Sequence, residues 1–395
     1  MQKKLMQLIE NSKEDSAFIS SKAQMDFWLL LVGTFLVFLT VSAVAVFAII
    51  YERNGLRQPL IGVVLSVYGA GTIMAVMLSG NLSRKYGSIR MMHIGLAIML
   101  LSYLSFSYTL NSFSLSIASR LAQGIGYGVF LAPAMVVAKG LLTKKKFVTL
   151  FGIYAASIPM PNIIGPALAQ MVLDTFDVAW YIPLTSIPMV LGVFIISRIH
   201  QNVRKSTGEG QSYSELLKNK KFLYACGLIL FVGLFFGFIP NYMATYLSEK
   251  HISLSSFFTT FSLSLILVRF LIAPFIEKKG HEVIVGGGIV GISVSYLLMG
   301  GDDLTEMLSV AAGIMFGIGY SLCYPRLSTM SIAPFSESER ERPVALFNAA
   351  FIFGTNFTPL LVGLMREHVG LDAILFSSGG VGLLVGIMLL IKKSG

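Results

Sequence analysis

The chain alternates long apolar stretches with short polar ones, and a helix needs about 20 mostly apolar residues to cross a bilayer. Twelve stretches meet that length, so the sequence predicts an all-α membrane protein with twelve transmembrane helices. The expected limits of these helices are 27–50, 59–80, 91–110, 114–141, 147–173, 178–198, 221–248, 254–276, 283–301, 307–333, 344–365 and 371–391.

One polar stretch between the predicted helices is much longer than the others and separates the first six from the last six. We interpret it as the linker between two bundles of six helices. This divides the chain into a cytoplasmic N-terminal segment at 1–26, an N-terminal bundle at 27–198, a cytoplasmic linker at 199–220, a C-terminal bundle at 221–391 and a cytoplasmic tail at 392–395.

Composition favours lipid as the surrounding medium, because 55% of the residues are hydrophobic and only 13% are charged. Soluble domains carry about 25% charged residues. The net charge of +10 alone would suggest a nucleic-acid partner, but the charges follow membrane topology instead. With the N-terminus inside, 22 of the 30 Lys and Arg residues fall in cytoplasmic segments and 4 in outer loops. Cytoplasmic loops are enriched in these residues, so both termini are expected in the cytoplasm and no nucleic-acid partner is expected.

Two cysteines and five histidines are scattered along the chain without the spacing of metal ligands. No nucleotide-binding or catalytic motif accompanies the apolar stretches, so we predict no metal, no cofactor, no catalytic residue and no enzymatic activity. ATP is therefore not expected to be a direct energy source. No cleavable signal peptide is predicted, because a long polar segment of mixed charge precedes the first apolar stretch.

The tetrapeptide GIGY occurs twice, at Gly124–Tyr127 and at Gly317–Tyr320, with an offset of 193 residues. The same offset relates Gly87 to Gly280 and Pro166 to Pro359, which indicates an internal repeat. Two halves of six helices would insert in the same orientation and form pseudo-symmetric bundles. The glycines of GIGY have two readings, close packing between helices or a flexible gating segment.

Residues 80–90, GNLSRKYGSIR, resemble the signature of the major facilitator superfamily between the second and third spans. Arg84 stands where that family usually has Asp, and Glu277 occupies the matching place in the second half. The resemblance implies a gating role for this loop, for the matching position in the second half and for the bend in the fifth span. These residues are Gly80, Arg84, Lys85, Gly87, Arg90, Glu277, Gly165 and Pro166.

Two further motifs resemble branches of the same family. Residues 120–126, RLAQGIG, are similar to the fourth-span motif of proton-coupled members. Gly152, Pro161 and the pair Gly165-Pro166 follow the spacing of the fifth-span motif of drug/proton antiporters, with Pro161 in place of one glycine. The resemblance implies two bundles that rock about a central site, a proton-coupled mechanism and export.

Apart from residues at the very ends of the predicted spans, four charged residues fall within them, and all are basic: Arg120, Lys139, Arg269 and Arg326. A charge at the bilayer centre costs about 2.5–3.5 kcal/mol on insertion scales, so it usually faces water or a partner. Lys139 lies close enough to the inner end to reach the interface. No acidic residue lies well inside a span, while Asp26 and Glu52 bracket the first one. A cavity with fixed cations only would attract carboxylates or phosphates.

Arg120 is the strongest candidate, since Gln123 and Tyr127 share its helix face at i+3 and i+7. Arg269 can instead pair with Glu277, and the asparagines can repair backbone bonds freed by nearby prolines. From spans that line the cavity in the family, the predicted substrate-cavity residues are Arg120, Gln123, Tyr127, Tyr68, Asn162, Asn241, Tyr242, Arg269, Tyr320, Arg326, Asn348 and Asn356. The candidates for proton coupling are Arg120, Asp26 and Glu52.

These observations predict a monomeric, proton-coupled exporter in the bacterial cytoplasmic (cell) membrane. Its expected partners are protons, lipid and a small anionic or zwitterionic, carboxylate-bearing metabolite, such as an organic acid or a metal chelator. A broad multidrug/proton antiporter and an anion uptake symporter or exchanger stay open as alternatives. A membrane enzyme or a sensor is disfavoured, because no catalytic constellation and no soluble output domain is evident.

Overall fold

The computed structural model describes residues 18–143, 147–158, 160–199, 216–268, 280–301, 303–336 and 341–391. Across these ranges the regular structure is helical, with short loops between the helices and one β-bridge between Phe18 and Leu142. The first half contains α2 (Ser21–Ser42), η1 (Ala43–Val46), α3 (Phe47–Arg53), α4 (Gln58–Tyr86), α5 (Ser88–Thr109), α6 (Phe113–Gly140), α7 (Phe147–Ala156), η3 (Met160–Ile163), α8 (Gly165–Thr175) and α9 (Val178–Ser197). The second half contains α11 (Lys220–Phe236), α12 (Ile239–Glu249), α13 (Leu254–Leu267), α15 (His281–Met299), α16 (Glu306–Ile332), α17 (Glu341–Met365) and α18 (Leu371–Ile391).

Ten helices in the described ranges are long and apolar enough to cross a membrane. Two of the twelve expected spans are not continuous helices of that length. The fifth is divided into α7, η3 and α8, and Pro161, which lacks a backbone N–H, lies buried in the 3-10 turn. The eighth is helical as α13 to Leu267, and most of its remainder, 269–276, lies outside the described residues. The expected linker, 199–220, also falls largely outside them.

The first helix begins at Ser21, six residues earlier than expected. Ser20 caps it, because its side-chain oxygen accepts a hydrogen bond from the backbone nitrogen of Ala23 at 3.1 Å. Asp26 therefore lies inside the helix rather than before it, and its side chain is buried at 3% exposure. This corrects the expectation that the acid stands in the polar N-terminal segment.

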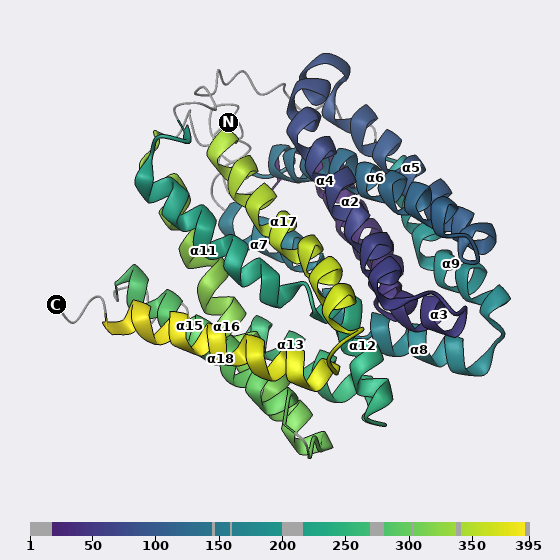
Figure 1. The fold of residues 1–395 in the computed structure, drawn as a ribbon. Coiled ribbons are helices and arrows are strands. Elements are labelled where there is room, and N and C mark those ends of the chain that lie inside the picture. Colours follow the sequence, from purple (N-terminus) through teal and green to yellow (C-terminus); the bar gives the residue numbers. More distant parts are fainter. Residues whose placement is uncertain are drawn as a thin grey trace, which may run out of the picture.

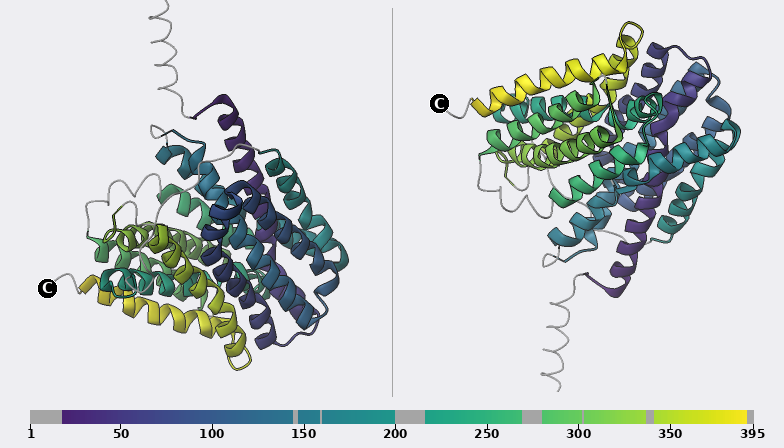
Figure 2. Two further views of the ribbon diagram at one scale, coloured as in Figure 1. Left: turned by 90° about the horizontal axis from the view of Figure 1, so that it is seen from above. Right: turned by 90° about the horizontal axis from the view of Figure 1, so that it is seen from below.

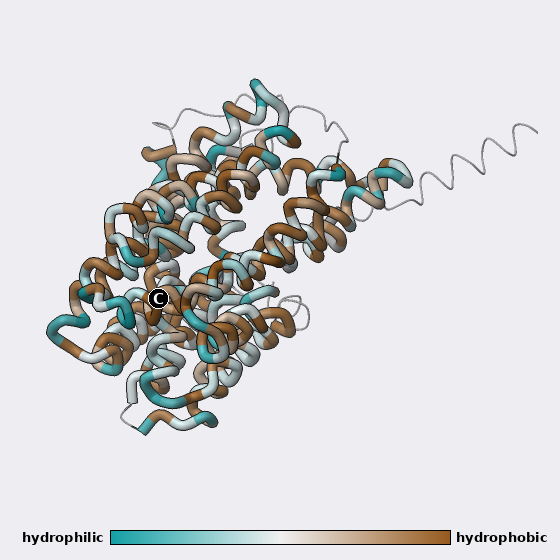
Figure 3. Tube along the Cα trace, turned by 90° about the vertical axis from the view of Figure 1, so that its right-hand side faces the viewer, coloured by the Kyte–Doolittle hydropathy of each residue, from teal (hydrophilic) through white to brown (hydrophobic). Residues whose placement is uncertain are grey.

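Large apolar side chains remain exposed in the middle of several helices, as expected for a surface that contacts lipid. Leu101, Leu384 and Met388 are each more than 60% exposed. Figure 3 shows hydrophobic residues along the helices and hydrophilic residues mainly near their ends. The distribution fits a multi-pass membrane protein and not a soluble helical bundle.

The two GIGY segments make equivalent contacts in the two halves. A Cβ atom added to Gly124 of α6 would meet the backbone of Tyr68 and Thr72 on α4. A Cβ atom added to Gly317 of α16 would meet the backbone of Phe261 and Leu265 on α13, the positions related by the same offset of 193 residues. The repeat thus preserves close helix packing, and α6 and α16 each continue as one helix through the motif.

Figures 1 and 2 show the helices of the two halves as two groups that meet near α3, α8 and α12. Following the predicted topology, we call this end of the molecule the outer end. We call the opposite end, where α4 and α9 finish, the inner end. The principal contact between the halves is between α4 and α17. Gly62 of α4 lies against the backbone of Pro359 and Gly363, so glycines allow the two helices to approach closely.

Candidate functional site

Arg120 lies about 10 Å along α6 from the outer end of that helix, and its side chain turns toward α4. Its Nη1 donates a hydrogen bond to Gln123 Oε1 at 2.7 Å, and its Nη2 donates to the backbone oxygen of Leu65 at 3.3 Å. The guanidinium also lies over the Tyr68 ring, 4.8 Å from its centroid. The predicted grouping of Arg120 with Gln123 is therefore present, and Tyr68 joins it from α4.

The positive charge of Arg120 has no counter-ion in the part of the chain that the structure describes. The side chain is 3% exposed and its Nε has no hydrogen-bond partner. No carboxylate of a described residue forms an ion pair with it, and its electrostatic neighbours are the phenols of Tyr51, Tyr68 and Tyr103. A buried charge without an opposite charge is costly, so this site is chemically suited to receive an anion.

An aromatic cluster lies next to this group and is formed by both halves. In the first half, the Tyr127 ring lies 5.6 Å from Tyr68 and 5.7 Å from Phe38. In the second half, the Tyr320 ring lies 4.8 Å from Phe236 and 5.8 Å from Tyr324. Gly69, which follows Tyr68, packs against Asn356 of α17, and Phe351 of α17 lies 6.0 Å from Tyr320, so α17 connects the two sets of rings. Phe38 and Phe236 were not predicted, because nothing in the sequence separates them from the other aromatic residues.

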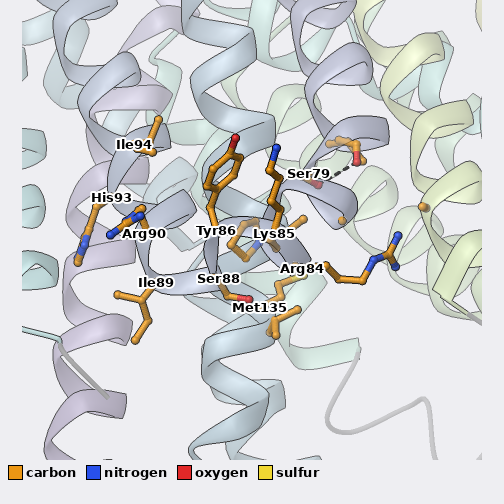
Figure 4. A pocket seen from close by; sticks show the side chains of 18 of the residues that line it. Ser79, Arg84, Lys85, Tyr86, Ser88, Ile89, Arg90, His93, Ile94 and Met135 are labelled. Atoms are coloured by element: carbon orange, nitrogen blue, oxygen red, sulfur yellow. Dashed lines mark hydrogen bonds between the residues drawn. The ribbon is translucent and has the colours of Figure 1, made fainter. Parts of the chain in front are cut away.

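A pocket of about 1100 Å³ opens at the inner end, between the end of α4 and the start of α17 (Figure 4). Val76 and Ser79 of α4 line it, as do Val344 and Asn348 of α17. Asn348 Oδ1 accepts a hydrogen bond from the Tyr324 hydroxyl at 2.8 Å. The pocket thus reaches a side chain that is bonded to the aromatic cluster, whereas α4 and α17 are packed together at the outer end.

The other predicted cavity asparagines have local structural roles. Asn241 donates to the backbone oxygen of Gly237 at 2.8 Å, where α11 ends before Pro240. Asn356 donates to Ile352 of its own helix at 2.9 Å and packs against Gly69 of α4. Asn162 is half-buried in the short turn η3. The contact of Asn241 fits the repair of a freed backbone carbonyl, whereas that of Asn356 is made to Ile352 and not to Thr355, whose carbonyl Pro359 leaves without a partner N–H.

The remaining predicted cavity residues lie in different places. Tyr242 is fully buried, and its hydroxyl lies 3.5 Å from the backbone oxygen of Pro359. Arg326 is half-buried on α16, next to Pro325. Arg269 and Glu277 lie outside the described residues, so the predicted pairing between them has no structural account.

The signature loop at the inner end makes the tight turn between α4 and α5. Gly87 has φ +90°, a conformation that L side chains rarely adopt, so glycine is required there. Arg84 bonds to Asn81, while Lys85 and Arg90 line the inner pocket together with Gly80. In the fifth span, Gly165 packs closely against Ser42, and Pro166 follows it in the first turn of α8.

Charged side chains from both halves meet at the outer end, in what we call the outer ion-pair cluster. Arg366, just after α17, contacts Glu249 of α12 and also Glu52 of α3 at 3.2 Å. Arg57 pairs with Glu367 at 2.8 Å. The Arg366 side chain is only 11% exposed. These contacts connect the halves directly, and of their members only Glu52 was a predicted functional residue.

Comparison with known proteins agrees with this architecture. The family model described as Major Facilitator Superfamily matches residues 30–325 and 234–394. The uncharacterized MFS-type transporter YttB of Bacillus subtilis is 22% identical over 348 residues, which are 83% of this chain and 85% of the relative. The multidrug transporter protein MdtP of Bacillus subtilis is 20% identical over 67% of this chain, and the match spans 60% of MdtP.

Solved structures show the same fold. The crystal structure of the nucleoside transporter NupG superimposes with a TM-score of 0.73 at 15% identity and covers 93% of this chain and 98% of its own. The matches over most of the chain, together with the helical halves and their repeat, show that the protein belongs to the Major Facilitator Superfamily of membrane transporters.

Proposed function

We propose that this protein is a twelve-span, proton-coupled exporter of a small anionic or zwitterionic metabolite that carries a carboxylate. The observation that carries the proposal is the buried Arg120 guanidinium, which has directional hydrogen bonds but no carboxylate partner among the described residues. Carboxylates match the planar donor geometry of arginine. We propose the bacterial cytoplasmic membrane as its location, with both termini inside.

The cargo would enter from the cytoplasm through the inner pocket. Arg84, Lys85 and Arg90 line that pocket, and no acidic residue is among its described lining residues. Fixed cations in a cleft with low-dielectric walls raise the local concentration of anions. Beyond Asn348 the cargo meets the aromatic cluster, and rocking of the two halves would then bring its carboxylate to Arg120.

Proton coupling is assigned to the outer ion-pair cluster. Arg366 and Glu249 belong to the second half, whereas Glu52 belongs to the first. When the halves part at the outer end, Glu52 separates from Arg366 and its carboxylate becomes accessible from outside, so we propose it as a group on the proton path. Asp26, buried near the inner end, and Arg120 are the other groups proposed for the coupling path.

Replacing Arg366 with Gln should shift the resting protein toward the outward-open state by about fivefold, because ~1 kcal/mol of contact between the halves is lost. Spin labels on Tyr108→Cys and Val369→Cys, which are 88% and 40% exposed in opposite halves, report the separation by pulsed electron resonance. Both labelled cysteines are introduced into a protein that carries Cys226→Ala, because Cys226 is a free and partly exposed cysteine. Reduction of both labels by an impermeant reductant added outside checks the proposed topology.

Arg53→Gln is the matched control for this experiment. Arg53 lies 3.8 Å from Asp174 at the same outer end, but both residues belong to the first half. Its removal should therefore leave the distance distribution unchanged. Equal distributions in wild type and Arg366→Gln would show that the cluster does not hold the halves together.

A multidrug exporter is the second candidate, favoured by the aromatic cluster, which offers several ring faces to a lipophilic cation. The relative MdtP is a multidrug transporter. This candidate and the first one differ in the sign of charge that the cargo carries, and a binding measurement separates them.

The test uses the purified protein in nanodiscs and two ligands with one ring system, naphthoate and naphthylmethylammonium. The proposed function predicts that the carboxylate binds at least tenfold more tightly than the amine. Tighter binding of the amine would refute it and support the multidrug candidate. Metabolite profiling of cells with and without the gene then identifies the cargo, and proton movement in inverted vesicles gives the direction of transport.

A further inference from the structure

The inner pocket has a second feature, an apolar wall beside its cations, which the proposed transport pathway does not use. Its wall is basic at the rim, where Lys85 and Arg90 flank the tight turn at Gly87, and apolar further along α5. Ile94 and Ala97 follow Arg90 by four and seven residues, so they lie about 6 Å and about 10 Å deeper along the helix. Val136 of α6 adds to this apolar wall, and Ile94 and Val136 remain 42% and 37% exposed.

The basic side chains in this pocket do not all have the same partners. Arg84 bonds to Asn81 and extends toward α17 in Figure 4, away from Arg90 and His93. His93 Nε2 lies 3.1 Å from the backbone oxygen of Ile196, so this nitrogen is engaged with α9. Lys85 lies against the Tyr86 ring, 5.2 Å from its centroid. A ring contact leaves the N–H groups of Lys85 able to bond to a ligand, and Arg90 lies on the same rim. Lys85 and Arg90 are therefore the two cations that can bind a ligand there.

A rim with two cations above an apolar wall matches one chemical class, a lipid with an anionic phosphate headgroup and an acyl chain. The enrichment of Lys and Arg at the inner face accounts for the charges but not for their position beside an apolar groove. Basic pockets between helices at this face are suited to anionic headgroups. The usual acid of the signature is replaced by Arg84, so the described lining residues contain no carboxylate that would repel a phosphate.

We propose that this pocket binds an anionic phospholipid of the inner leaflet, with its phosphate at Lys85 and Arg90 and an acyl chain along Ile94, Ala97 and Val136. Lys85 and Arg90 also line the proposed cargo entry, so a bound lipid would share these two cations with an entering anion. The lipid proposal does not depend on the identity of the cargo or on the direction of transport. Occupation of the pocket would attach the turn between α4 and α5 to the membrane surface on the side that opens in this conformation.

Native mass spectrometry of the purified full-length protein, titrated with lipid, tests the proposal. Phosphatidylglycerol should bind at least tenfold more tightly than phosphatidylcholine with the same chains. Lys85→Gln and Arg90→Gln should each weaken phosphatidylglycerol binding about fivefold. Ile94→Ser should weaken binding of long-chain but not of short-chain phosphatidylglycerol.

The matched control is Lys220→Gln with Lys221→Gln, which removes two charges at the inner end of α11, away from the pocket. This variant should bind phosphatidylglycerol as wild type does. Equal binding of the two lipids, or wild-type binding by Lys85→Gln and Arg90→Gln, would overturn the proposal. Full competition by inorganic phosphate would also overturn it, because the pocket would then be a site for free phosphate. Size-exclusion profiles confirm that each variant is folded.

Discussion

Replacing Gly126 with leucine should leave little monodisperse protein after extraction from the membrane. A Cβ atom at this position would lie 2.7 Å from the backbone nitrogen of Met99 and 2.9 Å from the backbone oxygen of Gly95. Backbone atoms cannot move aside as a flexible side chain can, so α6 and α5 would have to separate. We expect a cost of about 3 kcal/mol or more, at the upper end of the overpacking range.

Fluorescence-detected size-exclusion chromatography and thermal melting measure this effect. Gly319→Leu, the equivalent change in the second half, should behave in the same way, because Gly319 lies against Gly288 and Ile292. Gly287→Leu is the control, since nothing lies within 4 Å of a Cβ atom added there. A Gly126→Leu protein that is as stable as wild type but inactive would favour the flexible gating reading instead.

The features that the sequence predicted well are those that depend on local pattern or on repetition. Apolar stretches located the helices, and the 193-residue offset anticipated equivalent packing of Gly124 and Gly317. The spacing of Arg120 and Gln123 predicted a contact one helical turn apart, which the structure contains. The start of the first helix was misplaced because an apolar count ignores the cap at Ser20.

The features that were missed depend on contacts between distant parts of the chain. Arg366 reaches Glu52 across 314 residues, and Arg57 reaches Glu367 across 310. A single sequence carries no signal that pairs such positions, so the outer ion-pair cluster could not be anticipated beyond Glu52. The roles of Asn241 and Asn356 were open for a similar reason, since a polar residue near a helix bend can face either a cavity or its own backbone.

Arg120→Gln should lower the affinity for the carboxylate ligand about a hundredfold while the protein stays folded. The guanidinium is the one charged group that the structure places beside Gln123 and Tyr68 with no acid paired to it in the described chain, so its removal takes away the attraction for an anion. A hundredfold loss corresponds to about 2.8 kcal/mol, which is within the range of about 1.5–3 kcal/mol for one hydrogen bond to a charged group.

Arg120→Lys separates charge from geometry. Lysine keeps the positive charge but cannot contact Gln123 and Leu65 and stack on Tyr68 at once, so we expect about a tenfold loss. Tyr68→Phe is the control, because it keeps the ring under the guanidinium and should bind the carboxylate as wild type does. The naphthoate titration in nanodiscs measures all three variants, and size-exclusion profiles show whether they fold. Folded Arg120→Gln with wild-type affinity for naphthoate would mean that Arg120 supports the contact between α4 and α6 and takes no part in binding cargo, since the same two hydrogen bonds would then serve packing alone.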